Sequence, residues 1–177
     1  MDLSCFNPNS VGLLTNNIFG LPFKEEDARV VLLPVPWEAT VSYSVGTARG
    51  PEHILKASMQ VDLYDADVKE GWKQGFFMRK MDRPTLLRSD YLRKEAELYI
   101  NFLIEGGDIE ENEFLKHTLK EVNEGSYKLN KWVYEQSKAL LEKDKLVGLV
   151  GGDHSTPLGY MKAIAEKSGD YGILHID

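Results

Sequence analysis

The residues best suited to chemistry lie near the end of the sequence, in two short segments that each contain an apolar run. Residues 146–160 read LVGLVGGDHSTPLGY, so that a glycine pair precedes Asp153 and His154. Residues 171–177 read YGILHID, with His175 two positions before Asp177. Neutral imidazole and carboxylate groups are good ligands for divalent metal ions. The two segments therefore indicate a metal site with His154 and Asp177 as candidate ligands.

The same residues also have purely structural interpretations, and spacing alone leaves the function open. A histidine after a glycine pair is commonly a polar loop residue. Asp153, Ser155 or Thr156 can cap the next helix, with Pro157 in its first turn. His175 fits an ordinary hydrogen-bonded position on a strand.

Apolar runs and helical spacing predict an α/β fold. Residues 30–36, 146–152 and 171–177 are nearly continuous apolar runs, which is typical of strands covered on both faces in a parallel sheet. Helices are expected to start at Gly50-Pro51 and to cover 89–104 (capped by Ser89 or Asp90), 112–123, 127–145 and 157–169, with a break at Gly125-Ser126. A short strand is expected over 61–68, and a loop or hairpin over 69–84. This alternation favours three α/β/α layers around a mostly parallel sheet.

Both candidate segments fall where such a fold binds ligands, which is beyond the carboxyl ends of the strands. We expect Gly151 and Gly152 to adopt conformations closed to other residues and to allow another part of the chain to approach closely. On an extended strand, His175 and Asp177 point to the same side.

Composition excludes several classes of partner. The net charge is −7, from 28 acidic residues and 21 Lys plus Arg, which disfavours nucleic acid. No apolar run approaches the ~20 residues that span a membrane. The N-terminus lacks the pattern of a secretory signal, and Cys5 is the single cysteine. A cytoplasmic protein without membrane or nucleic-acid partners is expected.

Three ordered motifs resemble those of the ureohydrolases, the family of arginase, agmatinase and formiminoglutamase. Residues 151–155 (GGDHS) resemble the first metal-binding motif, and 173–177 (ILHID) resemble the start of the second. Residues 46–54 (GTARGPEHI) resemble the segment after the family's first strand. The resemblance implies an arginase-like α/β/α fold, two Mn²⁺ ions per complete site, and a metal-bound hydroxide that attacks a guanidino or formimino carbon to release urea or a related amide.

Carried over to this chain, the resemblance implies that His154 binds one Mn²⁺ and that Asp177 bridges both. Asp153, Ser155, His175, Gly151 and Gly152 are implied to be supporting residues. No residue of this chain is identified as catalytic beyond the metal ligands. The implied substrate is a small cationic guanidino or formimino compound, and the implied assembly is a homo-oligomer, either a trimer or a hexamer.

The chain carries only part of the family's pattern, because the other metal-ligand positions do not occur in it. We therefore expect an irregular lead-in over residues 1–28. Residues 29–177 are expected to be the N-terminal part of one arginase-like domain that is truncated at the second motif. Alone, these residues are predicted to be inactive and to bind Mn²⁺ weakly. Two alternatives stay open: a catalytically inactive binding or regulatory protein of this fold, and an unrelated α/β binding domain in which GGDHS is only a turn.

Overall fold

A parallel sheet lies at the centre of the molecule. The computed structural model describes residues 3, 5–13, 15–41 and 43–176. Within them, strand β1 (Val30–Val35) lies between β2 (Phe76–Met78) and β3 (Leu146–Gly151). All pairings are parallel, with Val30 opposite both Phe76 and Leu146. The carboxyl ends of β1 and β3 therefore meet at one edge of the sheet.

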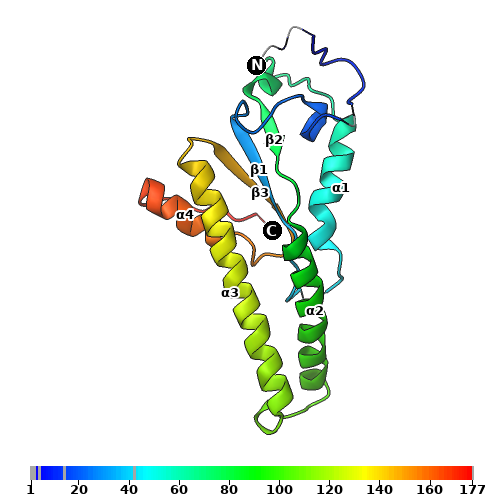
Figure 1. Cartoon of the computed structure of the whole chain (residues 1–177), viewed down its shortest axis with the longest axis vertical. Helices are drawn as coiled ribbons and strands as arrows, with labels where there is room; N and C mark the ends of the chain where they lie inside the picture. Colours follow the sequence, from blue (N-terminus) through cyan, green and yellow to red (C-terminus); the bar gives the residue numbers. More distant parts are fainter. Residues whose placement is uncertain (1–2, 4, 14, 42, 177) are drawn as a thin grey trace.

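Helices lie on both faces of this sheet, which confirms the predicted three-layer fold. They are α1 (Gly50–Ala57), α2 (Arg83–Ile104), α3 (Glu113–Leu141) and α4 (Leu158–Ser168). The crossover from β1 to β2 contains α1, and the return crossover to β3 contains α2 and α3. Parallel crossovers are right-handed, and these two crossovers run in opposite directions across the sheet. Their helices therefore lie on opposite faces. Figure 1 shows α1 on one side of the sheet and α3 on the other.

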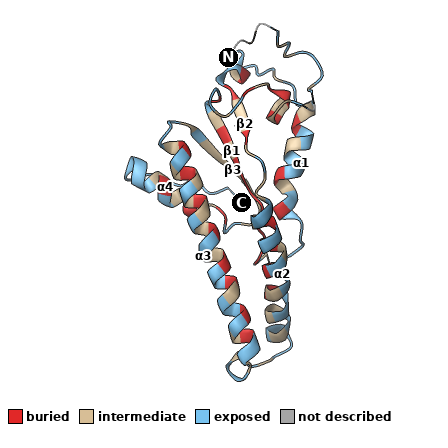
Figure 2. Cartoon of the chain, in the orientation of Figure 1, coloured by how far each residue is buried: buried red, intermediate tan, exposed pale blue. Residues whose placement is uncertain are grey.

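One face of β1 packs against the two long helices. Leu33 and Val35 alternate along the strand, so both side chains point to the same face. They form a buried cluster with Leu92 of α2 and Val133 of α3. Trp37, just beyond the strand, belongs to this cluster and is 2% exposed. In Figure 2 the buried residues follow β1 and the inner sides of α2 and α3, which locates the main core.

Helices α2 and α3 form a long hairpin that extends beyond the sheet (Figure 1). The predicted break at Gly125 is wrong, because α3 runs through it as one helix. A Cβ atom at Gly125 would overlap the side chain of Leu92. Glycine therefore allows close packing of the hairpin, and this packing offsets its low helix propensity of about 1 kcal/mol.

Helix α2 begins earlier than predicted. Its N-cap is Asp82, whose carboxylate accepts a hydrogen bond from the first turn. The predicted caps, Ser89 and Asp90, lie inside the helix instead. Ser89 is fully buried and accepts a hydrogen bond from the backbone N–H of Glu38 at 2.9 Å. It therefore ties α2 to the end of β1. The predicted end at Ile104 is confirmed.

The segment between α1 and α2 also departs from the prediction. Residues 61–68 are irregular and mostly exposed, so the predicted strand is wrong there. A strand forms instead at Phe76–Met78, inside the segment predicted to be a loop or hairpin, and it pairs in parallel with β1. A strand of three residues is too short for its alternating pattern to be recognised in the sequence. Its packing against the rest of the sheet decides that it forms a strand.

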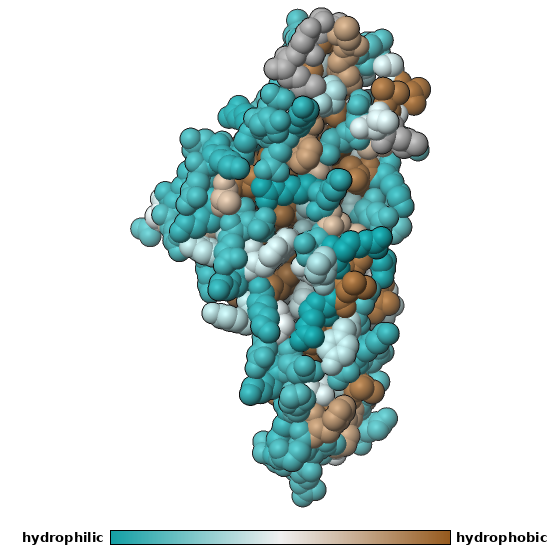
Figure 3. Space-filling view, viewed as in Figure 1, coloured by the Kyte–Doolittle hydropathy of each residue, from teal (hydrophilic) through white to brown (hydrophobic). Residues whose placement is uncertain are grey.

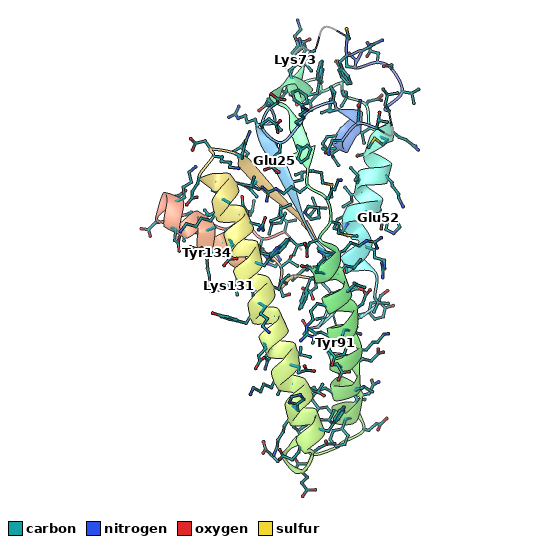
Figure 4. All side chains as sticks on the ribbon, viewed as in Figure 1. Glu25, Glu52, Lys73, Tyr91, Lys131 and Tyr134 are labelled. Carbon is teal, nitrogen blue, oxygen red and sulfur yellow. The ribbon has the colours of Figure 1, made fainter. Side chains whose placement is uncertain are left out.

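The N-terminal lead-in packs on the body of the same chain. Ile18, in the 3₁₀ helix η1 (Ile18–Gly20), and Leu21 are fully buried. Glu25, labelled in Figure 4, accepts two hydrogen bonds from the Arg79 guanidinium, both at 2.7 Å. Arg79 also donates to Gln136 of α3 at 2.8 Å. One guanidinium thus links the lead-in, the end of β2 and α3.

The surface over α3 and α4 is largely hydrophilic in Figure 3. The two helices are joined there by Tyr134 and Lys138 of α3, which both donate hydrogen bonds to Glu166 of α4 at 2.7 and 2.9 Å. Tyr134 is labelled in Figure 4. Among the described residues, no helix is long and apolar enough to cross a lipid bilayer.

Candidate functional site

The turn after β3 is attached to the carboxyl end of β1. The Gly152 N–H donates to the carbonyl of Val35 at 3.3 Å, and the Asp153 N–H donates to the carbonyl of Trp37 at 2.9 Å. These bonds continue the β1–β3 pairing beyond the sheet. His154 is therefore presented from a backbone that the neighbouring strand holds in place.

The two glycines of this turn allow neighbouring parts of the chain to approach the backbone closely. Neither Gly151 nor Gly152 has a positive φ, so the unusual conformation expected there is absent. A Cβ atom at Gly152 would overlap the backbone of Trp37, whereas one at Gly151 would meet the Thr156 hydroxyl at 3.1 Å. The space between the two backbones, rather than a left-handed turn, requires glycine at position 152.

Asp153 organises the turn with one carboxylate oxygen. Its Oδ1 accepts hydrogen bonds from the backbone N–H and the hydroxyl of Ser155, at 3.0 and 2.5 Å. Its Oδ2 is buried and has no hydrogen-bond partner in the described part of the chain. The Thr156 hydroxyl donates to the Asp153 carbonyl at 2.9 Å. The turn therefore satisfies one oxygen of this carboxylate and leaves the other without a donor.

The predicted capping of α4 is wrong in detail. The N-cap position is occupied by Pro157, without a side-chain cap, and the helix begins at Leu158. The hydroxyls of Ser155 and Thr156 bond back to Asp153 instead. They therefore hold the turn rather than the helix.

His154 is exposed and lines a pocket of about 400 Å³. One wall of the pocket is the turn itself, residues 152–155. The other wall consists of Thr40, Val41 and Thr47, from the segment that follows β1. The pocket lies at the edge of the sheet where parallel α/β folds bind ligands.

The last described segment returns to this pocket but does not form the predicted strand. Residues 171–176 are irregular, and Ile173, Leu174 and Ile176 are 60%, 86% and 85% exposed. A buried parallel strand needs cover on both faces, which the described residues do not supply here. The ring of His175 nevertheless lies 5.8 Å from that of His154, centroid to centroid, at an interplanar angle of 77°. Asp177 lies outside the described residues.

The structure reveals one further residue that the sequence analysis missed. Glu38 is 6% exposed, and its Oε2 accepts hydrogen bonds from the Gly46 N–H, the Ala48 N–H and the Thr47 hydroxyl at 2.7, 3.2 and 3.0 Å. Burial raises the pKa of Glu38, but these hydrogen bonds together outweigh it and leave the pKa below its ordinary value. An acid shortly after a buried strand and before a Thr- and Gly-containing loop was the available signal.

The described residues fit part of a metal site. They contain no group of three or more His, Cys, Asp or Glu side chains arranged to hold an ion. They do bring the His154 and His175 rings beside each other, and the turn also contains the buried, unpartnered Oδ2 of Asp153. Imidazole and carboxylate donors suit Mn²⁺ and similar divalent ions. Of the donors expected for a metal, the described residues therefore present the His154 imidazole at the pocket, with the His175 ring beside it.

The sequence of the chain matches that of a known protein family. The chain belongs to the arginase family, which it matches over residues 28–177. This membership confirms the family resemblance and excludes an unrelated α/β binding domain.

The similar curated proteins are N(1)-aminopropylagmatine ureohydrolases. Those of two Thermus thermophilus strains are 28% and 30% identical over 152 residues, which is 86% of this chain and 40% of each relative. That of a Synechocystis species is 50% identical over 42 residues, or 24% of this chain and 14% of the relative. The chain thus spans less than half the length of these relatives. No solved structure shows significant similarity.

Proposed function

We propose that this protein hydrolyses a small cationic guanidino compound and releases urea. The observation that carries the proposal is the position of His154, which lines the pocket at the carboxyl end of the sheet with His175 beside it. The two segments that resemble the family's metal motifs therefore approach each other. Family membership supports the same reaction class.

The proposed cofactor is a pair of Mn²⁺ ions in the complete site. His154 would hold one ion through an imidazole nitrogen, and Asp177 would bridge both. When bound, a metal pair supplies an activated water as nucleophile at neutral pH. The Asp153 carboxylate, fixed by Ser155, holds the turn and places His154 toward the pocket.

An agmatine-like compound is the proposed substrate. The relatives are named for N(1)-aminopropylagmatine, which carries a guanidino group on an extended amine. The pocket volume, about 400 Å³, lies in the range that holds small molecules. The Asp153 carboxylate at its wall favours a cationic ligand over an anionic one.

The test is urea release and Mn²⁺ binding by the protein expressed from its own complete gene. Purified protein is loaded with Mn²⁺ and assayed with arginine, agmatine and N(1)-aminopropylagmatine, and bound Mn²⁺ is counted by electron paramagnetic resonance. We expect urea from an agmatine-type substrate. His154→Ala should weaken Mn²⁺ binding by about 100-fold or more, because a ligand is lost.

His117→Ala serves as the matched control, because His117 is an exposed residue of α3. It should leave both urea release and Mn²⁺ binding unchanged. Stoichiometric Mn²⁺ binding without urea from any of the three compounds would favour the catalytically inactive alternative. An unchanged Mn²⁺ affinity in His154→Ala would contradict the proposed site.

A further inference from the structure

A closed loop faces the turn that carries His154. We call the described residues 38–41 and 43–48 the site loop. Its two ends are joined by Glu38, which accepts hydrogen bonds from Gly46, Thr47 and Ala48. The backbone N–H of Glu38 is itself fixed by Ser89 of α2. The base of the site loop is therefore tied both to itself and to the core.

The site loop is also tied to the turn across the pocket. The carbonyl of Trp37, directly before the loop, accepts a hydrogen bond from the Asp153 N–H at 2.9 Å. Movement of the loop base relative to His154 would break this bond. The base of the site loop is thus attached to the turn that carries His154.

The wall provided by the site loop is neutral and has two kinds of contact surface. Thr40 and Thr47 offer hydroxyl oxygens, and Val41 between them offers an apolar side chain. The Thr47 hydroxyl hydrogen is directed to Glu38, so that its oxygen lone pairs remain available as acceptors. Such a wall suits a linear chain of methylene groups interrupted by N–H donors.

We propose that the site loop is the specificity wall of the pocket and binds the linear amine chain of the substrate. This inference rests on the proposed guanidino hydrolysis. Thr40 and Thr47 accept hydrogen bonds from substrate N–H groups, and Val41 packs against the methylenes. Glu38 is a positioning residue: its Oε2 is committed to three hydrogen bonds inside the loop, and it acts on the substrate only through Thr47 and the loop backbone.

Steady-state kinetics on Mn²⁺-loaded protein, expressed from its complete gene, provide the main test. Thr40→Val keeps the shape of the side chain and removes the hydroxyl. We expect KM for N(1)-aminopropylagmatine to rise about 5- to 10-fold while kcat stays within about twofold. The lost hydrogen bond would stabilise the bound substrate and the transition state equally, so its removal changes KM and not kcat. Val41→Ala should also raise KM. Val45→Ala, in the same loop but 63% exposed and outside the pocket lining, should change neither constant.

Glu38→Gln tests the positioning role with a second readout. We expect faster amide hydrogen exchange at residues 46–48 and a raised KM, with an unchanged number of bound Mn²⁺ ions. If this variant does not fold, Thr47→Val removes one of the three bonds to Glu38 and should also speed exchange at residues 46–48. Exchange alone is then the readout, because Thr47 is also a proposed substrate contact. Unchanged exchange at 46–48 would overturn the role of Glu38.

Binding measured by calorimetry separates this inference from the proposed function. If the wild-type protein binds N(1)-aminopropylagmatine but releases no urea, the proposed reaction fails. The specificity wall is then judged by the affinity of Thr40→Val, which should be about 5- to 10-fold weaker. An equal affinity of wild type and Thr40→Val would overturn the wall. Absence of both binding and turnover would overturn both ideas.

Discussion

Gly152 and Trp37 meet backbone to backbone, and the space between them is too small for a single methyl group. Because Trp37 follows β1 and Gly152 follows β3, this contact sets the distance between the ends of the two strands. In the sequence, Trp37 comes directly before the site loop, and Gly152 belongs to the turn that carries His154. The contact therefore lies at the base of both walls of the pocket.

We therefore expect Gly152→Ala to destabilise the fold by about 3 kcal/mol, since rigid backbone rather than a flexible side chain must move. The measurement is the free energy of unfolding in urea. Gly172→Ala is the control, because a Cβ atom there meets nothing within 4 Å. Equal stabilities of the two variants would show that the strand ends can separate freely.

A similar contact joins α4 to α3. A Cβ atom at Gly159 would overlap the carbonyl of Asn130 and lie 2.7 Å from the N atom of Tyr134. Gly159→Ala should cost about 1–3 kcal/mol, although alanine is the better helix former. Thermal unfolding followed by circular dichroism measures the effect. A stabilised variant would mean that α4 packs on α3 less closely than described.

The beginning of α2 can be tested by its cap. Asp82 accepts hydrogen bonds from the N–H and the hydroxyl of Thr85, at 2.9 and 2.7 Å. Asp82→Ala should reduce the free energy of unfolding by about 1 kcal/mol. Asp90→Ala removes an ion pair with Arg49 whose side chains are 49% and 37% exposed, and should cost much less. If Asp90→Ala reduced the free energy of unfolding more than Asp82→Ala, the cap would lie at the position expected from sequence.

The ion pair of Glu25 and Arg79 should make stability depend on pH. Hydrogen bonds from Arg79 lower the pKa of Glu25 below its ordinary 4.5, with added attraction from Arg79 and against the effect of burial. A lowered folded-state pKa stabilises the fold above the unfolded pKa, and this contribution disappears as pH falls through the folded pKa.

Glu25→Gln should therefore cost about 1 kcal/mol at pH 7. The difference from wild type should shrink below about pH 4. Unfolding in urea at several pH values gives the result. Glu52→Gln, which removes an exposed pair with Lys56, is the control and should shift stability by less than about 0.5 kcal/mol at every pH. A pH-independent difference for Glu25→Gln would contradict the described pair.

The strands and helices with strong local signals could be predicted from the sequence. The apolar runs at Val30–Val35 and Leu146–Gly151 are strands, and α1 begins at Gly50, directly before the proline. Elements decided by distant contacts could not be predicted. Gly125 stays helical because Leu92 packs on it, and β2 exists because β1 is beside it.

The residues of the candidate site also differ in whether a local sequence pattern or a distant contact defines them. His154 could be found because a glycine pair after an apolar run is a local pattern. Glu38 was missed because its partners, eight to ten residues further on, become its neighbours only when the loop closes. The exposed segment with His175 could not be placed by its apolar residues, because burial of a strand depends on neighbours outside it.

The long hairpin of α2 and α3 has a consequence for how the chain folds. Its two helices are neighbours in sequence, so their contacts need only a short loop closure, whereas β3 must find β1 across the whole hairpin. We expect the hairpin to dock early and the β1–β3 pairing to limit the rate of folding. Changes at the hairpin should then slow refolding. Changes at a contact that forms after the pairing, such as that of Gly152 with Trp37, should mainly accelerate unfolding.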